Sequence, residues 1–119
     1  MKRIAIMQPT YLPWAGYFNI LSSVDTFYYL DDCQYERGSW QHRNRILIHN
    51  NESYLTIPVR REFLGIHIKD VLISSTDYTW RKKHSKSISM AYSKKPYYKE
   101  IIPILEIIED KSIISLMEL

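Results

Sequence analysis

Short apolar runs separated by polar turns dominate the first third of the chain. The continuous apolar run at residues 4–7 predicts a buried strand, and the β-branched and aromatic run at residues 26–30 predicts a second strand. Between them, apolar residues recur at every third position from Ala15 to Val24, which is helical spacing. This order of strand, helix and strand is typical of an α/β unit whose two strands run parallel.

The middle of the chain predicts further strands. Residues 45–49 and 54–59 flank a polar stretch at residues 50–53, which predicts a β-hairpin, because asparagine tolerates the positive φ of a tight turn. Residues 66–73 alternate partly between apolar and polar side chains and predict another strand.

Helical spacing of apolar residues returns after residue 74. We expect a helix over residues 78–93, with N-cap candidates in residues 74–77. Its inward stripe would hold Trp80, His84, Ile88 and Ala91. Because His84 belongs to this stripe, one turn from Trp80, we expect a structural histidine with satisfied ring nitrogens rather than a catalytic one.

The end of the chain predicts more helix. A second helix is expected to start near Tyr97, and Pro103 inside it implies a late start or a kink, because proline has no backbone N–H. Residues 112–119 form a third apolar segment, which we interpret as an exposed C-terminal helix. Such an end indicates a fragment of a longer chain, or a surface that packs on a second copy or a second domain.

Composition narrows the class of protein. The chain has 119 residues, 45% of them apolar, which predicts one domain with a core of its own. The order of the predicted elements makes this an α/β domain built on a Rossmann-like strand–helix–strand unit with a β-hairpin insertion and C-terminal helices. The net charge of +3 does not favour nucleic acid as a partner, and the single cysteine excludes an internal disulfide. No apolar run has the length of a membrane span or of a signal-peptide core, so we expect a cytoplasmic protein.

The first candidate site is the turn after the first predicted strand. In open α/β sheets, ligands bind beyond the carboxyl ends of the strands, and residues 8–17 and 31–45 both fall at that edge. Gln8 follows the strand directly, and Gly16 would let a ligand approach the backbone closely. The helix start beside Tyr17 offers free N–H groups to a phosphate. The alternative is a loop that its prolines and tryptophan merely shape.

The second candidate site follows the second predicted strand. Asp31 and Asp32 suit Mg²⁺, a general base or a sugar hydroxyl, since Mg²⁺ is often held by one or two carboxylates together with substrate phosphates. An Asx turn that caps the strand is the alternative. Arg43 and Arg45 share one face of an extended segment, so their guanidinium groups are placed to clamp one anion, unless they are ordinary surface arginines.

Further residues are candidates for contacts with the base, the sugar ring or the phosphate of a substrate. Aromatic and amide side chains stack on, or hydrogen-bond, a base or a sugar ring, although Tyr35 and Trp40 fit a role in packing the loop equally well. The basic residues near Arg81 would attract phosphate, or form the solvated face of a helix. The candidates for substrate or phosphate binding are Pro9, Tyr11, Gly16, Tyr17, Gln34, Tyr35, Trp40, Asn44, Arg81 and Lys82.

Several stretches, read in order, resemble the WbqC-like family, which is found among bacterial surface-polysaccharide (O-antigen) biosynthesis proteins. His42 stands where family members usually have asparagine. Family members are also usually longer, so the chain resembles their N-terminal half, and we expect a single domain over residues 1–119 that is truncated at its C-terminus. The matching stretches are residues 4–18, 24–27, 30–35, 40–46, 55–59, 68–71, 80–84 and 95–98, with Gln8-Pro9-Thr10-Tyr11-Leu12-Pro13-Trp14-Ala15-Gly16-Tyr17 and Trp40-Gln41-His42-Arg43-Asn44-Arg45 as the longest motifs.

The resemblance implies a role in the synthesis of surface-polysaccharide precursors. The function we expect is nucleotidylyl, acyl or glycosyl transfer on a phosphate-bearing small molecule, a nucleotide or a nucleotide-sugar. The catalytic candidates are Gln8, Asp31, Asp32, Arg43 and Arg45, with Mg²⁺ held at Asp31 and Asp32. The alternatives are a non-catalytic nucleotide or nucleic-acid binding module, and an assembly subunit that uses its C-terminal helix.

Overall fold

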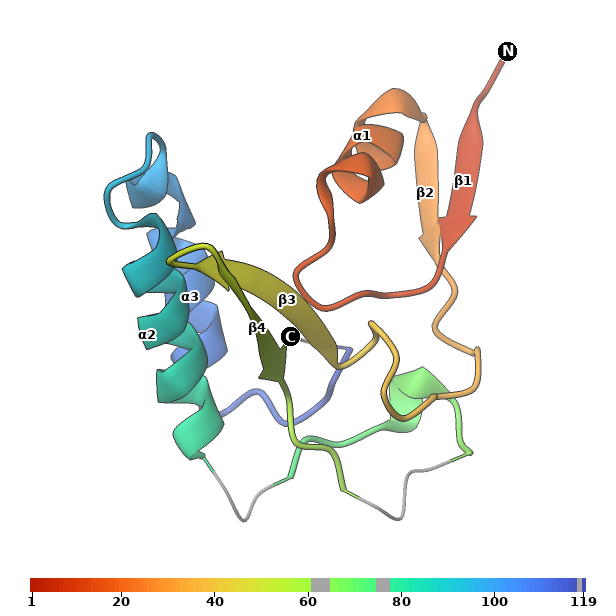
Figure 1. The fold of residues 1–119 in the computed structure, drawn as a ribbon. Helices are drawn as coiled ribbons and strands as arrows, with labels where there is room; N and C mark the ends of the chain where they lie inside the picture. Colours follow the sequence, from red (N-terminus) through yellow and green to blue (C-terminus); the bar gives the residue numbers. More distant parts are fainter. Residues whose placement is uncertain (61–64, 75–77, 118) are drawn as a thin grey trace.

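A computed structural model describes residues 1–60, 65–74, 78–117 and 119. The chain forms a mixed α/β structure in which a strand–helix–strand unit, a β-hairpin and a pair of helices lie one after another (Figure 1). In chain order the elements are β1 (Ile4–Met7), α1 (Ala15–Ser23), β2 (Thr26–Tyr29), β3 (Arg43–Ile48), β4 (Asn51–Thr56), the short 3₁₀ helix η2 (Ile68–Asp70), α2 (Thr79–Tyr92) and α3 (Tyr98–Glu109).

The predicted strand–helix–strand unit is confirmed. Strands β1 and β2 pair in parallel, with Ile4 opposite Thr26 and Met7 opposite Tyr29, and α1 connects them. The pairing continues one step further, because the backbone N–H of Leu30 donates to the carbonyl of Met7 at 2.8 Å. Within the described residues this sheet has two strands, so the Rossmann-like character is not confirmed beyond this unit.

The prediction that the first strand is buried is wrong for one of its faces. Alternate residues of a strand point to opposite faces of the sheet. Helix α1 covers the face that carries Phe27, since the Tyr17 ring lies 5.6 Å from the Phe27 ring. On the other face, Ile4 and Ile6 are each 58% exposed, and Tyr28 is exposed beside them.

The predicted hairpin forms, but its turn lies earlier than predicted. Strands β3 and β4 are antiparallel, with Arg43 opposite Thr56 and Ile48 opposite Asn51. The two-residue turn is His49-Asn50, whose φ angles are +48° and +65°. Such a short turn leaves the next three residues free to pair, which is why they extend β4. The hairpin is a two-stranded sheet of its own and is not inserted into the β1–β2 sheet.

Both predicted helices are confirmed. In α2, Trp80, His84 and Ile88 of the predicted stripe are buried. Of the N-cap candidates, residues 75–77 lie outside the described residues. Helix α3 begins at Tyr98 and contains Pro103, so the helix does not start late. The proline withdraws one backbone donor from the ladder of α3.

Two predicted elements are wrong. Residues 66–73 contain η2 and isolated bridges instead of a strand, because the backbone N–H groups of Ile68 and Lys69 donate to carbonyls of the loop that follows β2, at 2.9 and 3.0 Å. Residues 112–119, as far as they are described, are not an exposed helix. Their backbone bridges to Leu72, and the N–H of Leu116 donates to the carbonyl of Val71 at 3.0 Å. Leu116 is therefore buried in the chain's own core.

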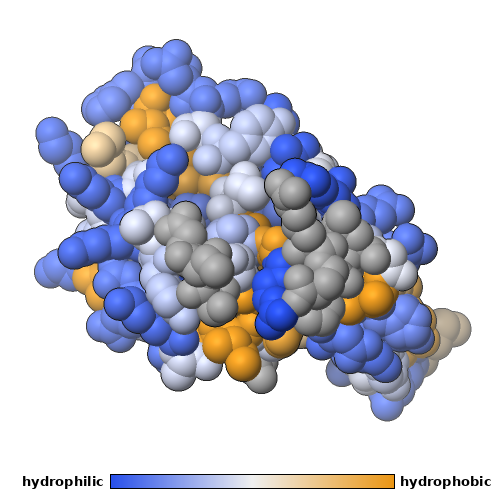
Figure 2. All heavy atoms as spheres, turned by 90° about the horizontal axis from the view of Figure 1, so that it is seen from below, coloured by the Kyte–Doolittle hydropathy of each residue, from blue (hydrophilic) through white to orange (hydrophobic). Residues whose placement is uncertain are grey.

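The core lies between the hairpin, the two helices and the segments that join them. On the face seen from below, hydrophilic side chains cover much of the surface, and apolar side chains show in separate patches between them (Figure 2). Among the described residues, no helix has the length and apolar character that crossing a membrane requires. The buried core cluster consists of Tyr11, Tyr35, Leu55, Ile57, Ile68, Val71, Ile73, Trp80, Ile88, Leu105, Ile108 and Leu116.

Candidate functional site

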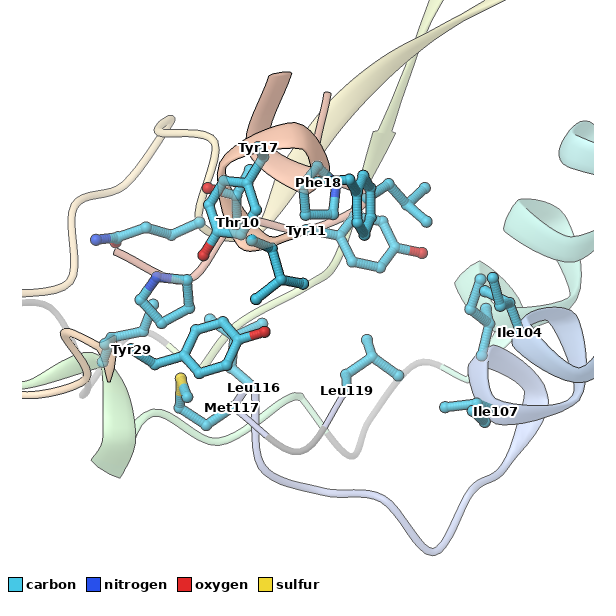
Figure 3. A pocket seen from close by; sticks show the side chains of 17 residues that line it. Thr10, Tyr11, Tyr17, Phe18, Tyr29, Ile104, Ile107, Leu116, Met117 and Leu119 are labelled. Carbon is cyan, nitrogen blue, oxygen red and sulfur yellow. The ribbon is translucent and has the colours of Figure 1, made fainter. Parts of the chain in front are cut away.

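A pocket lies where the sequence places a ligand, at the carboxyl ends of β1 and β2 (Figure 3). Its volume of about 670 Å³ is within the usual range for small-molecule sites. The turn after β1, the end of β2 and helix α1 form one wall, and α3 with the last residues of the chain forms the other. The labelled lining residues are Thr10, Tyr11, Tyr17, Phe18, Tyr29, Ile104, Ile107, Leu116, Met117 and Leu119.

The walls of this pocket are mostly apolar, and none of its described lining residues is charged. Two of its three tyrosine hydroxyls are already bonded. The Tyr17 hydroxyl donates to the backbone carbonyl of Gln8 at 3.0 Å, and the Tyr11 hydroxyl is hydrogen-bonded to His84 Nδ1 at 2.9 Å. The pocket therefore suits the uncharged body of a ligand, and a phosphate would have to lie at its rim.

Asn44 holds the turn that forms the pocket wall. Its side-chain amide donates to the carbonyls of Tyr11 and Leu12, at 3.0 and 2.8 Å. Leu12 needs such support, because its φ of +46° is unfavourable for a residue with a Cβ. The amide group predicted to bind substrate is thus used to fix the backbone of the turn to β3.

The space beside Gly16 is occupied by an indole ring. A Cβ atom added to Gly16 would lie 1.5 Å from Trp14 Cζ3, so the missing side chain makes room for Trp14. One N–H group of the first turn of α1 is also taken, because the N–H of Tyr17 donates to the carbonyl of Trp14. A ligand that approached the backbone here, as expected from the sequence, would have to displace the Trp14 ring.

The two predicted polar clusters do meet at one edge of the sheet. The pairing of Leu30 with Met7 brings Gln8 and Asp31, the residues that follow them, to the same end of the β1–β2 pair. Asp31 is partly buried and Asp32 is exposed, and neither lines the pocket. The described residues contain no group of three or more histidine, cysteine or acidic side chains that could hold a metal ion. Two carboxylates suit Mg²⁺ only where substrate phosphates and water complete its shell.

Arg43 and Arg45 share a face of β3, as predicted, and lie along two stacked aromatic rings. The Arg43 guanidinium lies 4.9 Å from the Tyr54 ring centre, and that of Arg45 lies 5.5 Å from the Trp40 ring. The two rings stack with an interplanar angle of 13° and are about half exposed. Arg45 also forms an ion pair with Glu52 at 3.0 Å. We call Trp40, Tyr54, Arg43 and Arg45 the arginine–aromatic ladder.

The ladder faces away from the turn that forms the pocket wall. Arg43 and Arg45 alternate with Asn44, and alternate residues of a strand point to opposite sides. Since Asn44 bonds the turn after β1, the two arginines lie on the other side of β3. The structure therefore does not bring the predicted clamp and the strand-end pocket together. Tyr35 is buried in the core, and Gln34 is exposed in a bridge with His67.

Arg81 joins the two C-terminal helices. It is buried, its guanidinium donates to the backbone carbonyls of Ile108, at 2.9 Å, and of Ile113, and it lies 4.6 Å from the Trp80 ring centre. Burial lowers the pKa of Arg81 below its ordinary value, although the guanidinium keeps its donor role. Lys82 is exposed beside it. Of the predicted phosphate-binding pair, one residue thus satisfies backbone carbonyls and the other faces solvent.

The expected burial and hydrogen bonding of His84 are confirmed. The ring is buried, is bonded to Tyr11 and lies edge-on to Trp80, with ring centres 5.0 Å apart. Burial lowers the pKa of His84 from 6.5 to about 4, an effect that a hydrogen bond with the backbone of Thr56 partly offsets. The imidazole is therefore neutral at pH 7.

Two polar residues that the sequence analysis did not assign to a site, Gln41 and His42, are buried. Gln41 lines the strand-end pocket, and its side chain holds the preceding loop by accepting from the N–H of Glu36 at 2.9 Å and donating to the carbonyl of Gln34. The His42 ring lies edge-on to the Tyr35 ring, with ring centres 5.5 Å apart. Both residues lie between Trp40 and Arg43 in one of the longest motifs that resemble the family, and this position was the signal in the sequence that could have drawn attention to them.

Comparison with known proteins shows that the chain belongs to the WbqC-like protein family, whose model matches residues 8–119. The chain is also similar to the uncharacterized protein Rv1507c of Mycobacterium tuberculosis, with 37% identity over 102 residues. That similarity covers 85% of this chain and 43% of Rv1507c, so the chain spans less than half the length of this relative. No solved structure matches the chain significantly.

Proposed function

We propose that this WbqC-like protein acts in the synthesis of surface-polysaccharide (O-antigen) precursors, as a group-transfer enzyme for a nucleotide or a nucleotide-sugar. The position of the strand-end pocket carries the proposal. A parallel strand pair with a pocket beyond its carboxyl ends is the usual ligand site of α/β proteins, and here polar residues follow both strands at that edge.

In this proposal the pocket takes the sugar or base, whose ring packs against its apolar and aromatic walls. The phosphate lies at the rim, where Gln8 and the carboxylates of Asp31 and Asp32 follow the strands. Asp31 and Asp32 would hold Mg²⁺ together with the substrate phosphates, and the ion would offset negative charge that develops during transfer. Arg43 and Arg45 contribute only where the substrate reaches round β3 to the ladder.

A thermal-shift screen against nucleotides and nucleotide-sugars, with and without Mg²⁺, tests this function. A ligand at about 100 times its dissociation constant should stabilise the protein by about 2.7 kcal/mol, a shift of several degrees. Ile104→Trp, which places an indole in the pocket, should abolish the shift. Ile102→Trp is the matched control, since it adds the same group to an exposed position of α3 outside the pocket lining.

Asp31→Asn separates the roles at the rim. The variant should lose the part of the shift that depends on Mg²⁺ and keep the part that does not. Binding that Ile104→Trp leaves intact, or no shift with any of these ligands in well-folded protein, would contradict the proposal.

A second candidate function rests on the arginine–aromatic ladder. Two half-exposed, stacked rings flanked by guanidinium groups suit the bases and phosphates of a single strand. A non-catalytic module of this kind should bind single-stranded oligonucleotides with an affinity that falls steeply as salt rises, and Trp40→Ala should weaken that binding. Retention of oligonucleotide binding in Trp40→Ala would exclude the ladder as the binding surface.

A further inference from the structure

Every described side chain is apolar on the wall of the strand-end pocket that α3 and the end of the chain form. We call this surface the aliphatic wall, and its residues are Ile104, Ile107, Ile108, Leu116, Met117 and Leu119. Ile104 and Ile107 lie one turn apart on α3, and each is nearly half exposed. In Figure 3 they lie across the pocket from Thr10 and Tyr29. Exposed apolar side chains gathered in one pocket indicate a binding surface.

The polar groups of the opposite wall are largely used within the chain. The hydroxyls of Tyr11 and Tyr17 are hydrogen-bonded, and both ends of the Gln41 amide hold the preceding loop. Pro9 and Pro13 have no backbone N–H to offer. A ligand therefore finds few partners here for polar groups of its own.

Two hydroxyls of the described lining residues remain for a ligand, those of Thr10 and Tyr29. Neither forms a hydrogen bond with another residue in the part of the chain that the structure describes. The Tyr29 hydroxyl points into the pocket (Figure 3). A buried hydroxyl without a partner weakens binding, and a sugar ring has several. The polar end of a ligand therefore belongs beside Thr10 and Tyr29, and the part along the aliphatic wall has to be apolar.

We propose that the substrate of this pocket carries an aliphatic acyl chain on its sugar, and that the chain lies along the aliphatic wall. The sugar then stays beside Thr10 and Tyr29. The volume of about 670 Å³ suits a drug-sized ligand, which is larger than a single sugar or base. None of the described lining residues is charged, as an uncharged hydrocarbon chain requires. The inference rests on the function proposed above and narrows its substrate class to an acylated nucleotide-sugar.

Alkyl β-glucosides of increasing length test this arrangement, because methyl, butyl and hexyl glucoside share one uncharged sugar. Each is titrated into the protein below the concentration at which it forms micelles, and the binding is followed by NMR of the isoleucine methyl groups. The signals of Ile104 and Ile107 should shift in a saturable manner. Affinity should rise about fourfold for each added methylene, the gain that corresponds to burial of one such group.

Two variants distinguish the two ends of the ligand. Ile107→Asn should reduce the gain to about twofold or less for each methylene, because a polar amide replaces part of the aliphatic wall. Tyr29→Phe removes one hydroxyl, so it should weaken the binding of every glucoside by the same factor and keep the gain for each methylene. Ile102→Asn makes the matched change at an exposed position of α3 outside the pocket lining, and it should keep the wild-type affinities.

Glucosides that bind equally well at every chain length, or that leave the Ile104 signal unmoved, would overturn the inference. A gain for each methylene that Ile107→Asn retains would also overturn it, since the chain would then bind elsewhere. So would a dimer of the ligand-free protein, detected by sedimentation, whose interface shields Ile104 and Ile107, because a second copy would then cover the aliphatic wall.

The same experiments distinguish a failure of this inference from a failure of the proposed function. A thermal shift with nucleotide-sugars but no gain along the glucoside series would leave the proposed function in place and exclude the acyl chain. A gain along the series without a shift for any nucleotide or nucleotide-sugar would overturn the proposed function and support the aliphatic wall as a binding surface.

Discussion

Burial of His84 should make the protein less stable as the pH falls from 6.5 to 4. The pKa of its imidazole is 6.5 in the absence of the fold and about 4 in the native state. Between these values the unfolded chain binds a proton that the native chain does not, so the free energy of unfolding falls as the pH falls. Below pH 4 both states are protonated, and this contribution becomes constant.

The size of the effect follows from the two pKa values. Between pH 7 and pH 4, His84 alone should reduce the free energy of unfolding by about 3 kcal/mol, which is a large share of the stability of a small domain. The assay is urea unfolding at pH 7 and at pH 4, with the midpoint and the slope fitted at each pH. His84→Gln cannot titrate in this range, so its loss of stability between the two pH values should be smaller than that of the wild type by this amount.

A control variant makes the assay decisive. His67→Gln, at an exposed position, removes a histidine without touching the core and should retain the wild-type pH dependence. Carboxylates that titrate near pH 4 contribute to all three proteins and cancel in the comparison. Equal losses of stability in the wild type and in His84→Gln would refute the conclusion that burial keeps this imidazole neutral.

Three further predictions follow from the contacts. In chemical unfolding, Arg81→Met should lower the free energy of unfolding by about 2–4 kcal/mol, because two backbone carbonyls lose their buried donor. The control Lys82→Met should stay within about 0.5 kcal/mol of the wild type, and equal effects of the two variants would contradict the structure. In the same assay, Asn44→Ala should lower the free energy of unfolding by about 1–3 kcal/mol, and Asn44→Asp should lower it further, since a carboxylate would face two carbonyl oxygens. An Asp variant as stable as the Ala variant would show that these hydrogen bonds are absent. Gly16→Ala should destabilise the wild type but stabilise a Trp14→Ala background by up to about 1 kcal/mol, and the same sign in both backgrounds would exclude the indole contact.

The regular elements were the predictable part of the fold. Helices α2 and α3 follow from apolar stripes at helical spacing, and a hairpin follows from Asn50, whose side chain tolerates a positive φ. The interpretation of residues 112–119 as a helix failed because an apolar run of this length is compatible with both helical and non-helical backbone. Backbone bonds to Val71 and Ile73 hold the described part of this segment in turns and one isolated bridge, and these partners are distant in the sequence.

For the candidate site, position was predictable and orientation was not. The order of strand, helix and strand predicts that Gln8 and Asp31 share one edge, as the parallel pairing confirms. Period-two alternation predicts that Arg43 and Arg45 share a face, but it does not say which face meets the turn after β1. The bonds of Asn44 to that turn decide it, and they place the arginines on the opposite side of β3.

The sequence by itself determined the family, the strand–helix–strand unit, the two long helices and the edge at which a ligand is expected. Each of these depends on local periodicity, turn chemistry or motif order. Only the tertiary structure decided that Arg81 serves carbonyls far along the chain, that Trp14 fills the space beside Gly16, and that His42 is buried against the ring of Tyr35. The reason is physical, because the role of a polar side chain depends on whether the surrounding fold supplies its partner, and those partners come from segments that no local pattern connects.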